Sequence, residues 1–142
     1  MTMTQEWLQV LNSAGFRVTR PLRAVVEVLT AAERALTPTD VYDLARRTYA
    51  RIGLTTVYRS LDKLEDAGLI ERVHQPDGCH AYVAAVEGHQ HLLICRHCQR
   101  TQYFHGDDLE PLMRLVSQES GYDIHTHWLQ FFGLCPECRP ST

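Results

Sequence analysis

The chain contains no long apolar run, and this absence sets the first limits on what it can be. No segment of its 142 residues approaches the roughly 20 consecutive apolar residues that a membrane-spanning helix needs. The N-terminus also lacks the basic and then apolar pattern of a secretory signal. We therefore expect a cytoplasmic protein without a membrane partner. A hydrophobic fraction of 44% and a charged fraction of 22% indicate a chain that folds around a core.

The signatures of catalysis are missing as well. The sequence has no Gly-rich phosphate loop, no serine nucleophile elbow and no H-E-x-x-H motif. We therefore expect no enzymatic activity.

A strong excess of one charge is also absent. The net charge of −3 argues weakly against a nucleic-acid partner, but the acidic excess lies entirely in residues 84–142. In residues 1–83, acids and bases balance, and nine of the ten basic residues are arginine. Arginine suits bidentate recognition of phosphate or guanine, so a DNA-binding first part stays open. The alternative is a set of solvated surface arginines.

The first part of the chain shows helical spacing followed by strand spacing. Its apolar pattern predicts helices over residues 4–14, from Pro21, from Thr37 and over residues 54–67. Two strands over residues 69–74 and 79–84 flank a turn at residues 76–78. Three helices followed by a hairpin are typical of a winged helix-turn-helix, in which one exposed helix face enters a DNA major groove.

The second part has a different organisation. Residues 85–90 are predicted to form a hinge, followed by strands over 91–95, 99–104 and 124–132 and a helix over about 107–120. Asp107 is expected to cap that helix. Its core face is expected to consist of Leu109, Leu112, Met113 and Val116. The fold class is therefore α+β: an N-terminal winged helix-turn-helix and a small α/β domain.

Two C-x-x-C motifs give the strongest chemical signal. They place Cys95 with Cys98 and Cys135 with Cys138. Two such turns can offer four thiolates and close a tetrahedron around Zn²⁺ with no open position, as in structural rather than catalytic sites. The alternative is a pair of redox dithiols or idle cysteines.

Histidines near these motifs suggest a second metal. His89 and His91 alternate along one extended segment, and His125 and His127 alternate along another. Each pair can therefore point to one side of its segment. The alternative is that all four are ordinary strand histidines.

The helix over residues 54–67 carries a polar face. Thr55, Thr56, Tyr58 and Arg59 combine groups that can pack on thymine methyls with a guanidinium that reaches guanine or phosphate. A helix that docks on a partner protein would explain the same face.

These motifs together resemble the ferric uptake regulator family of bacterial metal-sensing repressors. Residues 15–19 match the family's G-x-[KR]-x-T opening, although Leu22 stands where an arginine usually follows. Residues 56–61 match the recognition-helix signature T-V-Y-R-x-L. Residues 91–98 and 133–138 match the dimerisation domain.

The resemblance implies a winged-helix DNA-binding domain over residues 1–84, a hinge over 85–90 and a dimerisation and metal-binding domain over 91–142. Metal at a regulatory site would hold the two DNA-binding domains of a homodimer in a pose that fits a palindromic, A·T-rich operator. Arg17 matches the family residue that enters the minor groove. Further phosphate contacts are expected from Arg20, Arg23, Arg46, Arg47 and Arg51.

The resemblance also assigns metal ligands. The four cysteines match the structural zinc site. A second, regulatory site matches His89, His91, Glu110 and His127, which leaves His125 as an ordinary strand residue. Three imidazoles and a carboxylate suit Zn²⁺ or Fe²⁺.

The family's usual sensing site at the hinge is degraded in this sequence. Gln90 and Leu92 stand at two of its ligand positions, and neither an amide nor leucine is a good ligand for a transition metal. A substitute site could use Glu71, His74, Cys79 and His80. The alternative is that Cys79 is idle.

The sequence is thus interpreted as a homodimeric, metal-dependent repressor that binds double-stranded operator DNA and controls zinc uptake. Zinc is preferred because the intact second site is rich in nitrogen. An iron- or manganese-responsive regulator is the alternative within the family. A zinc-stabilised winged-helix module that binds protein is the alternative from another class.

Overall fold

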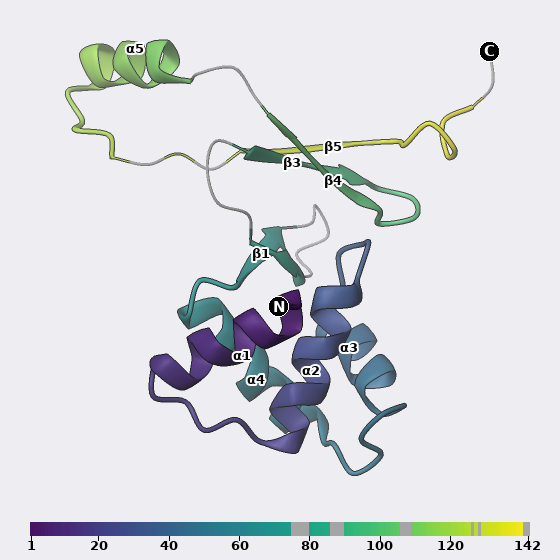
Figure 1. Cartoon of the computed structure of the whole chain (residues 1–142). Coiled ribbons are helices and arrows are strands. Elements are labelled where there is room, and N and C mark those ends of the chain that lie inside the picture. The colour runs from purple at the N-terminus through teal and green to yellow at the C-terminus, as the bar shows by residue number, and fades with distance from the viewer. Residues whose placement is uncertain (75–79, 86–89, 106–108, 126, 128, 141–142) are drawn as a thin grey trace. The chain divides into compact units, whose positions relative to one another are not determined.

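The computed structural model describes residues 1–74, 80–85, 90–105, 109–125, 127 and 129–140. It divides into two compact units, Met1–Ala85 and Val86–Thr142, each of which is described by itself. Helices dominate the first unit and a small sheet dominates the second (Figure 1). The α+β class is therefore confirmed. No helix in the described part of the chain is both long and apolar enough to span a membrane.

Four helices build the first unit: α1 (Met3–Ser13), α2 (Arg20–Ala31), α3 (Pro38–Ala45) and α4 (Leu54–Asp66). Side-chain caps explain where several of them begin. The amide of Asp40 donates to Thr37 Oγ1 at 3.1 Å, and Asp40 Oδ2 accepts from the Thr37 amide at 3.0 Å. This reciprocal capping box satisfies two amides that the helix itself leaves unpaired.

The apolar stripes of these helices meet in one core. Its most deeply buried large side chains include Leu11, Leu22, Val25, Val26, Val41, Val57, Leu61 and Leu64. Each such burial stabilises the fold by about 1.5–3 kcal/mol. Val10 of α1 is apolar but exposed. The inward side of this helix is formed by Trp7, Leu8 and Leu11.

A hairpin follows the helices, formed by β1 (Ile70–His74) and β2 (His80–Ala84). The strands are antiparallel and in register from Ile70 opposite Ala84 to His74 opposite His80. A bridge between Leu36 and Tyr82 adds a third short segment to this sheet. The expected turn at residues 76–78 lies outside the described residues.

The second unit contains β3 (Gln90–Cys95), β4 (Thr101–His105), α5 (Glu110–Ser120) and β5 (Gln130–Gly133). The strand order is β4-β3-β5, with β3 antiparallel to β4 and parallel to β5. The predicted strand over residues 124–132 is wrong in extent. Only Gln130–Gly133 pairs with β3, and residues 124, 125, 127 and 129 form no strand.

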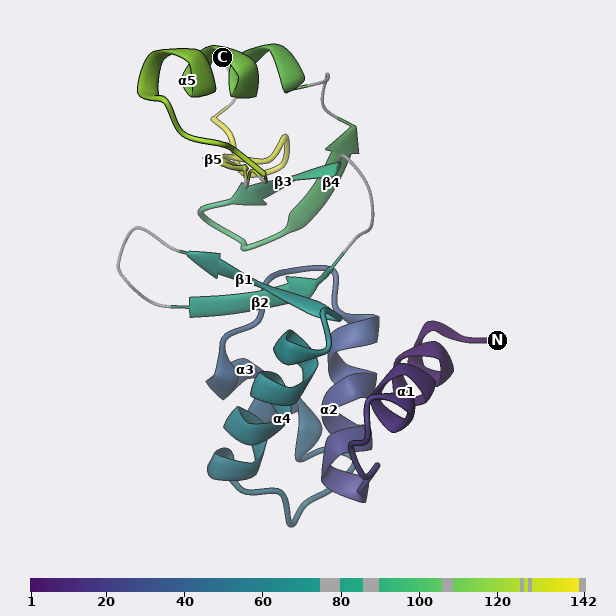
Figure 2. The same ribbon diagram turned by 90° about the vertical axis from the view of Figure 1, so that its left-hand side faces the viewer.

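The predicted core face of α5 is also wrong for a single chain. None of residues 110–120 is buried, and Leu112 and Val116 are exposed by 56% and 43%. Figure 2 shows the helix standing off from the sheet of its own unit. The helix starts at Glu110 after Leu109 without a side-chain cap, and Asp107 lies outside the described residues. The apolar residues have the predicted helical spacing, but nothing in the described part of the same unit buries them.

Candidate metal centre and nucleic-acid interface

The four cysteines converge in the second unit. All four Sγ atoms lie within 4.8 Å of one another, and Cys98 Sγ lies 3.8 Å from Cys135 Sγ. Four sulfurs about 2.3 Å from a central Zn²⁺ would be about 3.8 Å apart along each edge of the tetrahedron. The thiols are free, with Cys95 buried and the other three half-buried. The donor set therefore fits a closed zinc site in both chemistry and spacing.

Strand pairing explains how residues 40 positions apart come together. The parallel register places Cys95 beside Gly133, so the second C-x-x-C turn begins two residues after the end of β5. The Arg96 amide donates to the Gly133 carbonyl at 2.8 Å, which continues the pairing. At the surface, Arg100, two residues after the first motif, forms an ion pair of 3.1 Å with Glu137 of the second motif.

Amide hydrogen bonds prepare one of these thiols for a metal. The backbone amide of Cys98 has the largest effect in lowering the pKa of Cys95 to about 5, followed by that of Cys135, which donates to Cys95 Sγ at 3.4 Å. Hydrogen bonding to the Cys135 side chain and burial raise the pKa of Cys138 to about 12. Several thiolates this close together repel one another, and this repulsion opposes the loss of their protons. A bound cation neutralises the repulsion, so metal binding and proton release occur together.

Two of the predicted second-site ligands lie close together. The rings of His91 and His127 have centroids 5.6 Å apart. His91 is buried, and its Nε2 has no hydrogen-bond partner among the residues that the structure describes. An unpaired buried polar atom costs about 1–3 kcal/mol, so this nitrogen is suited to a ligand that binds it.

The other two predicted ligands are not placed with them. His89 lies outside the described residues. Glu110 lies at the exposed start of α5, 3.7 Å from Arg114, and it does not join His91 and His127 in a ligand group. Among the described residues, the four cysteines are the only gathered set of three or more such ligands. The complete second site therefore stays a prediction. His125 pairs with Asp123 at 3.4 Å, separate from the proposed ligands.

The substitute hinge site does not form one cluster. Glu71 is opposite Val83 in the hairpin register, three positions from His80. Side chains alternate along a strand, so Glu71 and His80 lie on opposite faces. Burial raises the pKa of Glu71. The backbone places His74 opposite His80, and Cys79 lies outside the described residues. The four residues are close together in the sequence, but their spacing alone does not show on which face of the hairpin each side chain lies.

The predicted DNA-reading face of α4 is largely open. Thr55, Tyr58 and Arg59 are exposed, while Val57, Leu61 and Leu64 point into the core. Thr56 is half-buried and therefore stands at the edge of this face. Arg17, in the segment before α2, is exposed too, as are the predicted phosphate contacts Arg20, Arg23, Arg46, Arg47 and Arg51.

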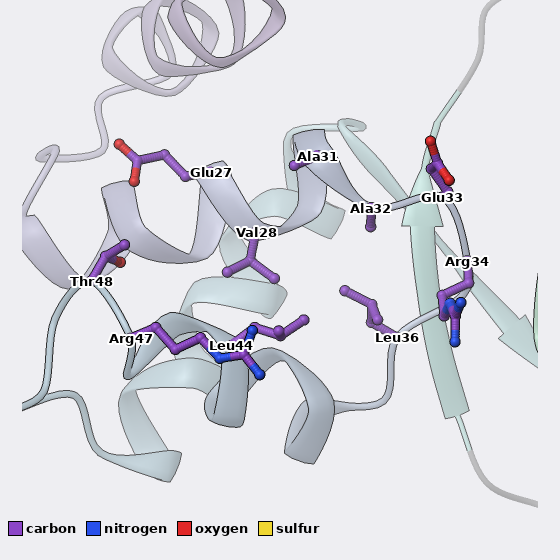
Figure 3. A pocket seen from close by; sticks show the side chains of 10 residues that line it. All are labelled: Glu27, Val28, Ala31, Ala32, Glu33, Arg34, Leu36, Leu44, Arg47 and Thr48. Carbon is purple, nitrogen blue, oxygen red and sulfur yellow. The ribbon is translucent and has the colours of Figure 1, made fainter.

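Arg47 has a second environment. It lines a groove of about 480 Å³ between α2 and α3. Figure 3 shows its side chain running beside Leu44, with Val28 and Leu36 nearby. The aliphatic stem of Arg47 thus covers apolar surface, so Arg47 is less free to follow a phosphate than a fully solvated arginine.

A bidentate ion pair that the sequence did not reveal ties α4 to the hairpin. Arg72 Nε and Nη2 donate to the two carboxylate oxygens of Glu65 at 3.1 and 2.9 Å. The guanidinium of Arg72 also lies 5.7 Å from the ring centroid of Tyr82. Hydrogen bonding to Glu65 raises the pKa of Arg72. The spacing of these residues along the chain carries no signal of this contact.

The family profile described as "Ferric uptake regulator family" matches residues 13–132, most of the chain. The chain belongs to this family. Its members are metal-responsive transcription regulators and not enzymes, so the expected absence of enzymatic activity and the family resemblance are confirmed. The chain is 32% identical over 130 residues to the ferric uptake regulation protein of Neisseria meningitidis, covering 91% of this chain and 90% of that one.

Similarity extends equally to a zinc-named member of the family. The zinc uptake regulation protein of Mycobacterium tuberculosis is 32% identical over 129 residues, covering 91% of this chain and 99% of that one. The fold matches the solved ferric uptake regulator of Helicobacter pylori with a TM-score of 0.77 at 23% identity, covering 98% of this chain and 95% of that one. The relatives therefore establish the family and leave the metal open.

Proposed function

We propose that this family member is a homodimeric, metal-dependent transcriptional repressor that binds a palindromic, A·T-rich operator and controls zinc uptake in the cytoplasm. The observation that carries the proposal is the pairing of an exposed Thr55-Tyr58-Arg59 helix face with a converged four-cysteine cluster in one chain. Residues 1–84 would bind DNA, residues 85–90 would act as the hinge and residues 91–142 would bind metal and a second copy.

Zinc is the proposed ion of the four-cysteine cluster. Thiolate sulfur is the softest protein ligand, and a closed set of four at tetrahedral spacing favours Zn²⁺ over the harder cations. Cys95, Cys98, Cys135 and Cys138 would hold the ion and thereby join the two ends of the second unit. Because no coordination position stays open, the ion would stabilise the unit and take no part in sensing.

The proposed regulatory ion would bind at His91 and His127, completed by His89 and Glu110. The unpaired, buried Nε2 of His91 supports a ligand at this place. Nitrogen-rich coordination favours zinc, and Fe²⁺ or Mn²⁺ is the second candidate. Relatives of equal similarity carry iron and zinc names, so similarity alone does not choose between these two metals. The hinge substitutes reduce to His74, Cys79 and His80, because Glu71 lies on the other face from His80.

Uncovered apolar surface in the second unit supports the homodimer. Leu112, Leu115 and Val116 are exposed on α5, and Phe131 and Phe132 are exposed on β5, an edge strand. Soluble monomers rarely leave an apolar helix face and an unpaired strand edge open together. A second copy of the chain would cover both.

The decisive experiment combines elemental analysis with metal-titrated DNA binding. Full-length protein should hold about two metal ions per chain, and His89→Ala with His127→Ala should lower this to about one. Tyr58→Ala and Arg59→Ala should each weaken binding to a duplex selected from a random pool. Unchanged binding in both variants would contradict the role of α4. Failure of wild-type protein to select any duplex would favour the protein-interaction module.

A further inference from the structure

Leu54, the first residue of α4, is apolar and exposed, although the aliphatic side chains that follow it in the helix are buried. Its exposed fraction is 42%, whereas Val57, Leu61 and Leu64 are at most 1% exposed. Tyr58 follows four residues later and is 49% exposed. Side chains four residues apart are neighbours on a helix surface. Leu54 and Tyr58 therefore form an apolar strip at the start of α4 that the core does not use.

The surroundings of this strip favour a polyanion as its partner. Arg51 precedes the helix, and Thr55 and Arg59 lie on its exposed side; all three are exposed. In the part of the structure that is described, neither Arg51 nor Arg59 has an acidic side chain within ion-pair distance. Their guanidinium charges therefore stay available for an anionic partner, which favours a polyanion with regularly spaced phosphates. An apolar strip between these two arginines matches a DNA groove, where thymine methyl groups lie close to backbone phosphates.

We propose that Leu54 is a specificity-determining residue that contacts the C5-methyl group of a thymine in the operator. The inference rests on the proposed function and adds to it a residue that contacts a base directly. Thymine is the only base that presents a methyl group in the major groove, and the first residues of a recognition helix are the ones that reach base edges. Leucine offers no hydrogen bond, so Leu54 would read this methyl group and nothing else on the base.

The test is a double-mutant cycle between Leu54 and single thymine methyl groups. Zinc-loaded, full-length protein first selects a duplex from a randomised pool. Each thymine of that duplex is then replaced by uracil, which lacks only the methyl group. Removing a methyl group that Leu54 contacts should raise Kd about fourfold, as expected for one buried carbon. In Leu54→Ala, which keeps a good helix former at the position, the same replacement should have no effect.

Two further variants keep the test decisive. Val10→Ala shortens another apolar side chain with an equal exposed fraction of 42% on α1, and it should leave Kd and the uracil effects at wild-type values. Leu54→Met preserves apolar length and should retain the uracil effect. Equal uracil effects in wild type and Leu54→Ala at every thymine would overturn the assignment of Leu54 while leaving DNA binding intact. Failure to select any duplex would overturn both the assignment and the proposed function.

Discussion

The two units of this protein are stabilised by different means. Met1–Ala85 buries the apolar stripes of four helices in one core and starts three of them with side-chain caps. Val86–Thr142 has a three-stranded sheet, an uncovered helix and four converging thiols. The first unit therefore has a core of its own. The second unit would gain stability from a metal at its four thiols and from a partner over its exposed apolar side chains, because closing a metal site and covering apolar surface both stabilise a small domain.

The largest expected effect removes the metal from the second unit alone. Cys135→Ser should abolish zinc binding at the four-cysteine cluster and unfold the second unit, because structural zinc contributes roughly 10–16 kcal/mol in small zinc domains. Hydrogen exchange should show lost protection in β3–β5 and unchanged protection in α2–α4. Uniform loss of protection in both units would contradict the view that the two units are stabilised by different means. Ser13→Ala, at the exposed end of α1, is a control that should retain the metal.

A core truncation should act on the first unit alone. Leu61→Ala removes a side chain that is 1% exposed, and such changes cost about 2–5 kcal/mol because they leave a cavity. Urea unfolding followed by circular dichroism should show an early transition of the helical unit. Zinc content measured before unfolding should stay at the wild-type value. A loss of zinc would mean that the two units do not fold independently.

A surface change on α5 should act on assembly and hardly on the fold. Leu112→Asp puts a charge on a side chain that is 56% exposed in the single chain. If a second copy covers this face, burying the unpaired charge should raise the dimer dissociation constant at least tenfold, or about 1.4 kcal/mol. Analytical ultracentrifugation measures this constant. Gln118→Asp, exposed on the same helix but outside the apolar stripe, should leave it near the wild-type value.

The smallest expected effect concerns pH and the hairpin of the first unit. Burial raises the pKa of Glu71 above its usual value of 4.5, so the folded state holds this proton more tightly than the unfolded chain does. Stability should therefore fall as pH rises through the interval from 4.5 to the folded pKa. Glu71→Gln should raise Tm slightly at pH 7 and have no effect below pH 4. An equal gain at both pH values would show that charge burial is not the cause.

The first unit was largely predictable because local signals and the core agree there. Thr37 with Asp40, the stripes of α2 and α4, and the two strands of the hairpin all follow from short-range spacing. The ion pair of Glu65 with Arg72 was not predictable, since no pattern links a helix end to a strand residue seven positions later. In the second unit, the predicted core face of α5 was wrong. An apolar stripe indicates that some surface covers the helix, but it does not indicate which surface that is.

The sequence by itself determined the family, the order of the elements and the cysteine motifs, because each of these follows from the type and spacing of residues near one another in the chain. Only the tertiary structure decided which distant groups meet. Parallel pairing of β3 with β5 brought four sulfurs within 4.8 Å, and the segment before β5 lies with His127 beside His91. The hairpin register placed Glu71 and His80 on opposite faces, and the packing of α4 left Leu54 exposed. Strand register and burial depend on contacts between segments far apart in the chain, and residue spacing does not encode them.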